Sequence, residues 1–146
     1  MKVIYVSGPY RAGTEAGVQE NIHRAWVETA RLWSAGFAVI CPHKNTEHME
    51  GLEGVSNDDI LAGELELVSR CDAIYMLKGW VKSDGAKAEH TEAGRLGLKV
   101  YYESGYCCNR CNSPVEEGTE KFDGEYPYYC LECDENMYSF EVHPSI

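Results

Sequence analysis

The 146-residue sequence has no long hydrophobic run. No apolar stretch approaches the roughly 18 residues that a membrane-spanning helix needs, so we expect no membrane partner. The first nine residues hold only a four-residue apolar stretch, V-I-Y-V. This stretch is too short for the core of a secretory signal and is typical of a first β-strand. We therefore expect a cytoplasmic protein.

Basic residues are scarce: 13 Lys and Arg stand against 24 Asp and Glu, for a formal net charge of −11. Such a charge repels polyanions at long range, which disfavours generic binding of nucleic acid. A small phosphorylated ligand stays compatible with it where local donors and a helix N-terminus outweigh the global field. The apolar fraction of 44% suffices for a packed core and argues against wholesale disorder.

Short apolar runs alternate with helical patterns over the first two thirds of the chain. We expect strands at residues 2–7, 37–41, 72–77 and 99–102. We expect helices over 15–35 with Gly36 as the C-terminal cap, from Asn57 or Asp58 to 70, and over 85–96 after Ser83 or Asp84. This alternation predicts an α/β fold, a parallel sheet with helices on both faces. Ligands bind beyond the carboxyl ends of such strands, where loops 7–13, 42–57 and 78–85 lie.

Seven cysteines, five of them in the C-terminal third, favour a metal site over disulfides in a cytoplasmic chain. Cys108/Cys111 and Cys130/Cys133 are two C-x-x-C knuckles whose sulfurs suit one tetrahedral Zn²⁺, with a β-hairpin between them. Cys107 is an alternative to Cys108 as the first ligand. Four protein ligands leave the zinc no open position, so we expect a structural ion and no catalytic cofactor.

Two other interpretations of these cysteines stay open. They could be reduced free thiols, or His90-Thr91-Glu92 followed by Cys108-x-x-Cys111 could match the zinc-site signature of nucleobase deaminases. The second has no proline before the cysteines and leaves the last C-x-x-C without a role. Because the composition changes after Glu103, we place a boundary near residues 104–105. The expected domains are an α/β domain over 1–104 and a zinc ribbon over 105–146.

Residues 79–94, G-W-V-K-S-D-G-A-K-A-E-H-T-E-A-G, carry the main catalytic candidate. Ser83 and the free N–H groups of the helix start form a cradle for an anion. Small apolar residues flank Glu89 at helical spacing, so its carboxylate points toward the sheet one turn beyond the cradle. Partial desolvation there raises a carboxyl pKa. The alternative is a solvated glutamate that pairs with Lys87 or Arg95.

The loop after the first strand, S-G-P-Y-R-A-G, is a second candidate for ligand binding. A glycine-framed loop can present backbone N–H groups, and Arg11 can bind a phosphate through its forked guanidinium. The loop matches neither the Walker motif nor the dinucleotide fingerprint, and an ordinary turn is the alternative. Its candidate binding residues are Gly8, Pro9, Tyr10, Arg11 and Gly13.

Further polar residues lie near the same edge of the sheet. Glu64, Glu66 and Asp72 precede or open the third strand, and most such acids are solvated surface charges. His43 and His48 lie in the second loop, where they could contact a base or bind nothing.

Taken together, these loops resemble the nucleoside 2-deoxyribosyltransferase superfamily, above all its 2′-deoxynucleoside 5′-phosphate N-hydrolase branch. The matching stretches are residues 5–13, Y-V-S-G-P-Y-R-A-G; 39–46, V-I-C-P-H-K-N-T; and 71–89, C-D-A-I-Y-M-L-K-G-W-V-K-S-D-G-A-K-A-E. The resemblance covers about residues 1–103. It implies a flavodoxin-like, Rossmann-like sheet, a homodimer, and a small deoxynucleotide as the ligand.

The resemblance also implies roles for single residues. Glu89 matches the nucleophile, and Tyr5 matches a tyrosine near the reacting sugar. An active-site aspartate of the family falls on Glu64, where the extra methylene displaces the carboxyl group. Asp72 matches a structural aspartate. The implied phosphate contacts are Gly8, Arg11, Gly13 and Ser83, with Gly85 beside them at the helix start.

We therefore expect an enzyme that cleaves or transfers the N-glycosidic bond of a 2′-deoxynucleoside 5′-monophosphate. Glu89 would attack C1′, and Glu64 or another acid would assist the leaving base. The alternative is a non-catalytic nucleotide-binding sensor with the zinc ribbon as a protein-docking module, which the replacement at Glu64 motivates. The base, the acceptor and the role of the ribbon stay open.

Overall fold

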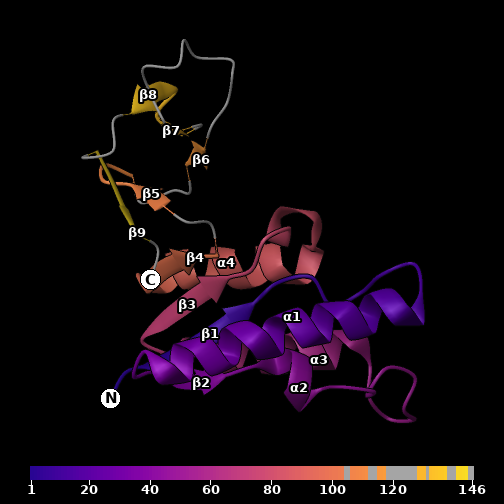
Figure 1. The fold of residues 1–146 in the computed structure, drawn as a ribbon. Helices are drawn as coiled ribbons and strands as arrows, with labels where there is room; N and C mark the ends of the chain where they lie inside the picture. The colour runs from indigo at the N-terminus through magenta and orange to yellow at the C-terminus, as the bar shows by residue number, and fades with distance from the viewer. Residues whose placement is uncertain (104–105, 112–114, 118–127, 131, 138–140, 145–146) are drawn as a thin grey trace. The chain divides into compact units, whose positions relative to one another are not determined.

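The computed structural model describes residues 1–103, 106–111, 115–117, 128–130, 132–137 and 141–144. They fall into two compact units, Met1–Tyr101 and Tyr102–Ile146. The first unit is built on a four-stranded parallel sheet with helices on both faces, which confirms the predicted flavodoxin-like α/β class (Figure 1). The predicted boundary at residues 104–105 lies outside the described residues. The assignment of 1–104 and 105–146 as two functional domains stays a prediction.

The sheet has the strand order β2-β1-β3-β4. Its strands are β1 (Val3–Ser7), β2 (Ala38–Ile40), β3 (Ala73–Met76) and β4 (Lys99–Tyr102). Strand β1 pairs in parallel with β2 on one side and with β3 on the other, so that Ile4 lies opposite both Val39 and Ala73. Since β1, like β3, is hydrogen-bonded along both edges, it is held rigidly and is a good platform for a functional side chain.

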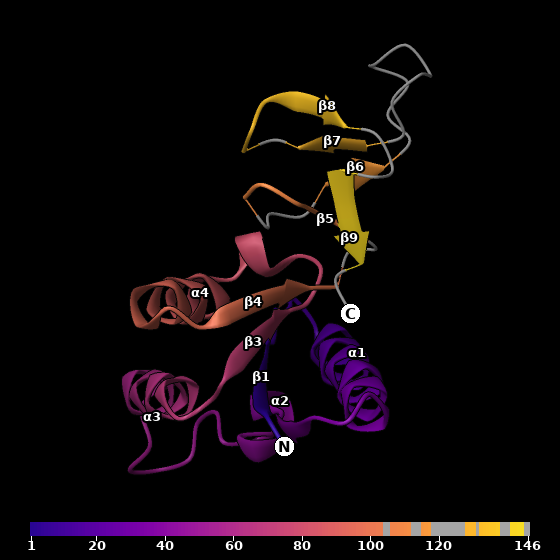
Figure 2. The same cartoon turned by 90° about the vertical axis from the view of Figure 1, so that its left-hand side faces the viewer.

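Helices cover both faces of this sheet (Figure 2). They are α1 (Glu15–Ser34), α2 (Pro42–Asn45), α3 (Asn57–Ser69) and α4 (Asp84–Leu96), with a 3₁₀ turn, η1 (Trp80–Lys82), before α4. Helix α1 lies on one face, and α3 and α4 lie together on the other (Figure 2). None of the helices in the described part of the chain has the length and apolarity needed to cross a bilayer.

The helix starts follow local capping chemistry. Ser83 caps α4 by accepting a hydrogen bond from the Ala86 N–H, as one of the two predicted caps. For α3, the predicted cap at Asn57 or Asp58 is wrong. Ser56 is the cap, because Ser56 and Asp59 form a reciprocal capping box three residues apart. Gly36 follows α1 with φ 93°, the left-handed conformation expected after a helix end.

Alternation along β1 divides its side chains between the two faces of the sheet. Ile4 and Val6 pack into the apolar core on the α1 side, together with Leu32 and Tyr75. Tyr5 and Ser7 therefore point to the opposite face, and both form hydrogen bonds with a residue of α4. The core of the first unit thus fixes two polar hydroxyl groups of β1 against α4.

The second unit is a small β structure around the C-terminal cysteines. Its strands are β5 (Tyr106–Cys108), β6 (Glu116–Glu117), β7 (Tyr128–Cys130), β8 (Glu135–Met137) and β9 (Val142–Pro144). Strand β5 pairs with β9, and β7 pairs with both β6 and β8, all antiparallel. The antiparallel pairing of β6 with β7 matches the hairpin predicted between the two knuckles. Val115, Met137 and Val142 pack against the buried cysteines.

Gly8 directly follows β1, at a point where its backbone passes very close to Leu77. A Cβ atom at Gly8 would lie 2.6 Å from the Leu77 Cβ, which is fixed to the backbone and cannot give way. We expect Gly8→Ala to lower the free energy of unfolding by about 1–3 kcal/mol through overpacking, measured by urea denaturation.

Gly13 provides the matched control, since a Cβ there would meet nothing within 4 Å and its φ is not left-handed. Gly13→Ala should be neutral or stabilise by up to about 1 kcal/mol. Equal unfolding midpoints for the two variants would contradict this account of the first loop.

Candidate active site

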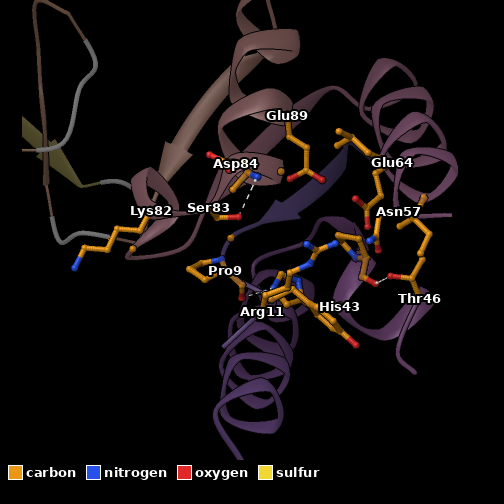
Figure 3. A pocket seen from close by; sticks show the side chains of 18 of the residues that line it. Pro9, Arg11, His43, Thr46, Asn57, Glu64, Lys82, Ser83, Asp84 and Glu89 are labelled. Carbon is orange, nitrogen blue, oxygen red and sulfur yellow. Dashed lines mark hydrogen bonds between the residues drawn. The ribbon is translucent and has the colours of Figure 1, made fainter. Parts of the chain in front are cut away.

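A cleft of about 820 Å³ lies at the carboxyl ends of β1 and β3 (Figure 3). Three segments line it, within the ranges 8–11, 42–64 and 78–89, together with Arg24 of α1. They include parts of all three loops that the sequence placed at this edge of the sheet. The volume lies within the range of about 300–1,000 Å³ that is typical of small-molecule sites.

Glu89 forms the floor of this cleft. It projects from α4 toward β1, and only 4% of its surface is exposed. The Tyr5 hydroxyl donates a hydrogen bond of 2.7 Å to Oε1, and the Ser7 hydroxyl donates one to Oε2. The alternative of a solvated Glu89 is wrong. Its two proposed partners pair elsewhere, Lys87 with Asp84 and Arg95 with Glu92.

Burial decides the ionisation of Glu89. Loss of water around the carboxyl group raises its pKa to about 7, although the hydrogen bonds from Ser7 and Tyr5 lower it and the Glu64 charge raises it further. Burial also raises the pKa of Tyr5 far above its ordinary value, and the nearby charge of Glu89 raises it further. Tyr5 therefore keeps its proton and acts as a donor. Glu89 is a carboxyl group that gains and loses its proton near neutral pH.

Glu64 is a second carboxyl group in the cleft. It comes from α3, is half-buried, and turns into the same hollow as Glu89 (Figure 3). Burial raises the pKa of Glu64 as well. A carboxyl group of this kind can hold a proton and release it to a bound ligand. The extra methylene relative to an aspartate thus does not prevent Glu64 from reaching the cleft.

Charged groups of both signs line the cleft, five acids and four cations. Lys82 and Ser83 lie at one end, Glu64 and Asn57 lie at the other, and Glu89 lies between them (Figure 3). The cations that line the cleft are Arg11, Arg24, Lys78 and Lys82. Although the chain carries a net charge of −11, the N-terminus of α4 with Ser83 is the part of the cleft that suits an anion.

The predicted phosphate contacts divide into two groups. Ser83 and Gly85 line the cleft at the start of α4, and Gly8, Pro9, Tyr10 and Arg11 line it from the first loop. Ser83 uses its oxygen to cap the helix, which leaves its hydroxyl hydrogen available to a ligand. Gly13 is not among the residues that line the cleft, and Tyr5 lies beneath Glu89 rather than on the cleft wall.

His43 supports the first loop from below. It is 3% exposed, and its Nε2 lies 3.0 Å from the Pro9 carbonyl oxygen. Because a carbonyl can only accept, Nε2 carries the hydrogen in this contact. Burial lowers the pKa of His43, which keeps the ring neutral. His43 thus lines the cleft as predicted and also holds the loop that carries Arg11.

The structure also brings residues into the site that the sequence reasoning missed, chiefly Ser7, Arg24 and Asn57. For Ser7 a signal was present. It lies two positions after Tyr5 in a strand, and the period of two places both side chains on one face. For Arg24 and Asn57, the single sequence holds no comparable signal, because both lie on ordinary amphipathic helices.

The four cysteines Cys108, Cys111, Cys130 and Cys133 have all their sulfur atoms within 4.8 Å of one another. Two of the sulfur pairs are 3.8 and 3.5 Å apart. A tetrahedral Zn²⁺ with bonds of about 2.3 Å requires sulfur atoms about 3.8 Å apart, whereas a disulfide bond is about 2.05 Å long. The sulfur positions thus fit a four-thiolate metal site.

Backbone donors complete this cysteine cluster. The N–H groups of Arg110 and Cys133 point at the sulfurs of Cys108 and Cys130, each at 3.4 Å. Such contacts orient thiolate ligands and stabilise their charge. Of the two alternatives for the first ligand, Cys108 belongs to the cluster, while the side chain of Cys107 lies outside the described residues. His90, the ligand that a deaminase site would need, stacks its ring on Trp80.

Comparisons with known proteins support this fold. A family model described as a domain of unknown function (DUF4406) matches residues 2–102. A search of the curated proteins found no match. A 2-deoxyribosyltransferase from Bacillus psychrosaccharolyticus is similar in structure with a TM-score of 0.50 and 20% identity, over 68% of this chain and 70% of that one. A 2-deoxyribosyltransferase from Leishmania mexicana gives a TM-score of 0.51 and 16% identity, over 92% and 94%. At these identities the similarity establishes the fold.

The raised pKa of Glu89 has a measurable effect on stability. Its pKa of about 7 in the folded state exceeds the ordinary value of 4.5, so the folded state binds the proton more tightly than the unfolded chain. This contribution is fully present below pH 4.5 and is lost as the pH rises through about 7. The free energy of unfolding of the wild type should therefore fall by about 3 kcal/mol from this cause as the pH rises from 4.5 to above 7. Glu89→Gln, which has no group to ionise here, should not show this fall.

Urea denaturation at several pH values measures this effect as the difference between wild type and variant. Glu66→Gln on the exposed side of α3 is the matched control and should follow the wild type. If wild type and Glu89→Gln show the same dependence on pH, Glu89 is not the desolvated group described above.

Proposed function

The chain belongs to the DUF4406 family, a domain of unknown function, and we propose that it cleaves the N-glycosidic bond of a 2′-deoxynucleoside 5′-monophosphate. The observation that carries the proposal is the position of Glu89. It is a buried carboxyl group, held at both oxygens, at the floor of a nucleotide-sized cleft. A shared fold with two 2-deoxyribosyltransferases supports glycosyl chemistry at this position.

The groups that line the cleft suggest how such a substrate would lie. The phosphate would bind at the α4 N-terminus with Ser83 and Lys82, and Arg11 would close over it. The sugar would then lie over Glu89, and the base would reach Glu64 and Asn57 at the other end. An anchored phosphate holds C1′ against the carboxylate, which turns part of the binding energy into rate.

In the first step, an ionised Glu89 oxygen would form a bond to C1′ while the C1′–N bond breaks. The electron pair of that bond leaves with the base, and Glu64 would supply a proton to it. The raised pKa of Glu64 suits a group that must arrive protonated. A 2′-hydroxyl on the substrate would contact the nucleophile, which gives a physical reason for preferring the 2′-deoxy sugar.

In the second step, water or a second base would attack C1′, and the electron pair of the C1′–O bond would return to Glu89. The proton of the attacking group would go to the ionised Glu64. Water as the acceptor makes the protein a hydrolase, and a base makes it a transferase.

The enzyme can be tested with a panel of deoxynucleoside monophosphates, with free base detected by chromatography. We expect base release by the wild type and a loss of at least about a thousandfold in Glu89→Gln, because the nucleophile is removed. Glu66→Gln, outside the cleft, should keep full activity. Deoxynucleosides without the phosphate should react more slowly, since they lack the anchor.

Two outcomes would contradict the proposal. Unchanged base release in Glu89→Gln would remove Glu89 from the mechanism. Tight nucleotide binding without any turnover would instead support the alternative of a nucleotide sensor with the second unit as a protein-docking module.

We further propose that the cysteine cluster binds one structural Zn²⁺. The sulfur spacing and the two backbone donors support this ion, and four thiolates leave it no open position for a substrate. A small β unit with few apolar residues would gain most of its stability from such a metal.

Metal analysis of the purified protein should find about one Zn²⁺ per chain, and the ion should be lost in Cys130→Ser. Loss of the ion should expose the second unit to limited proteolysis while the first unit stays resistant. Cys71→Ser is the matched control, because Cys71 is a buried cysteine of the first unit. Zinc-free protein with an equally resistant second unit would rule out the structural ion.

A further inference from the structure

Ser7 makes one of the two hydrogen bonds that hold the Glu89 carboxyl group, a role that the sequence did not assign to it. Its side chain is 0% exposed and its hydroxyl donates to Glu89 Oε2. The second donor, Tyr5, holds Oε1. Ser7 does not line the cleft itself, so it cannot contact a ligand directly. Any effect that Ser7 has on chemistry must therefore act through Glu89.

The backbone leaves Ser7 little freedom to do anything else. Its carbonyl oxygen accepts the Leu77 N–H at 2.8 Å, and the residue pairs with Met76 in the register of β1 with β3. The neighbouring Gly8 packs against Leu77 with no space for a side chain. The strand therefore fixes the Ser7 Cβ, and the hydroxyl meets α4 at the position of Glu89.

We propose that Ser7 is a positioning residue for Glu89, a role that rests on the proposed function of Glu89 as the nucleophile. With both oxygens held from one rigid strand, the carboxylate keeps a single orientation toward C1′. The same bond would stabilise the carboxylate when the C1′–O bond breaks and the electron pair returns to Glu89. Ser7 would thus assist orientation in the first step and departure in the second.

The surroundings of Glu89 make this bond important. The groups that act on the Glu89 carboxyl are Tyr5 and Ser7 from β1 and Glu64 from α3. Glu64 and burial both raise the pKa of Glu89, and the hydrogen bond from Ser7 is the first of the two contacts that lower it. The cations on α4 are engaged with other acids, Lys87 with Asp84 and Arg95 with Glu92. The two hydroxyl donors thus keep an ionised Glu89 accessible near neutral pH.

The direct test is a titration of the Glu89 carboxyl carbon by NMR in protein labelled at glutamate, assigned by the signal that Glu89→Gln lacks. Ser7→Ala should raise the pKa of Glu89 by about one pH unit, the effect of one hydrogen bond to a charged group. With substrate, the acid limb of the kcat/KM profile should move to higher pH by the same amount. At a fixed pH below the pKa of Glu89, kcat/KM of Ser7→Ala should be about tenfold lower than that of the wild type.

Two further variants separate the hydrogen bond from packing. Ser7→Cys keeps the shape of the side chain but replaces the hydroxyl with a weak donor, so it should titrate like Ser7→Ala. It also keeps the test decisive if Ser7→Ala fails to fold. Thr29→Val removes another buried hydroxyl, whose oxygen has no hydrogen-bond partner among the described residues, and should titrate like the wild type.

The titration needs no substrate, so its result is independent of the proposed reaction. A Glu89 pKa in Ser7→Ala and Ser7→Cys equal to that of the wild type would overturn the role of Ser7, whatever the activity. A shifted pKa together with no turnover of any deoxynucleotide by the wild type would instead overturn the proposed function. A shifted pKa with an unshifted kcat/KM profile would also overturn the positioning role.

Discussion

The buried contact between β1 and α4 at Glu89 is the interaction on which the site depends. Burying a carboxyl group is costly unless hydrogen bonds replace the lost water. Tyr5 and Ser7 supply these bonds from the central strand, and that strand is held on both edges by β2 and β3. The apolar side chains of β1 on the opposite face fix the strand against α1. One strand thus carries both the core and the support of the proposed nucleophile.

The same contact places a destabilised carboxylate at the cleft, where a ligand can contact it. The raised pKa of Glu89 means that its ionised form is less stable in the fold than in water. Other acids of the first unit pair with cations instead, as Glu92 does with Arg95. Four cations line the cleft although the whole chain has a net charge of −11. The buried carboxyl group thus lowers stability at neutral pH at a position that lines the cleft, which is common at functional sites.

Sequence patterns predicted the parts of the structure that depend on periodicity and fixed spacing. The alternation of strands and helices, the burial of Glu89 on its helix and the four-cysteine cluster belong to this class. Helix α2 was not predicted, because four residues after Pro42 are too short to show a helical period. The prediction placed the cap of α3 at Asn57 or Asp58 instead of Ser56, because several good capping residues follow one another there. Only the reciprocal hydrogen bonds of Ser56 with Asp59 decide between them. Ser7 was overlooked because its partner lies far away in the sequence, on α4.

The central claim, a covalent role for Glu89, is tested most directly by trapping the intermediate. Protein mixed with a deoxynucleoside monophosphate is quenched rapidly in acid, digested, and analysed by mass spectrometry. The account predicts a deoxyribose-phosphate adduct on the peptide that contains Glu89, with the ester on that side chain. Base release without an adduct on this peptide, or an adduct on another residue, would contradict it.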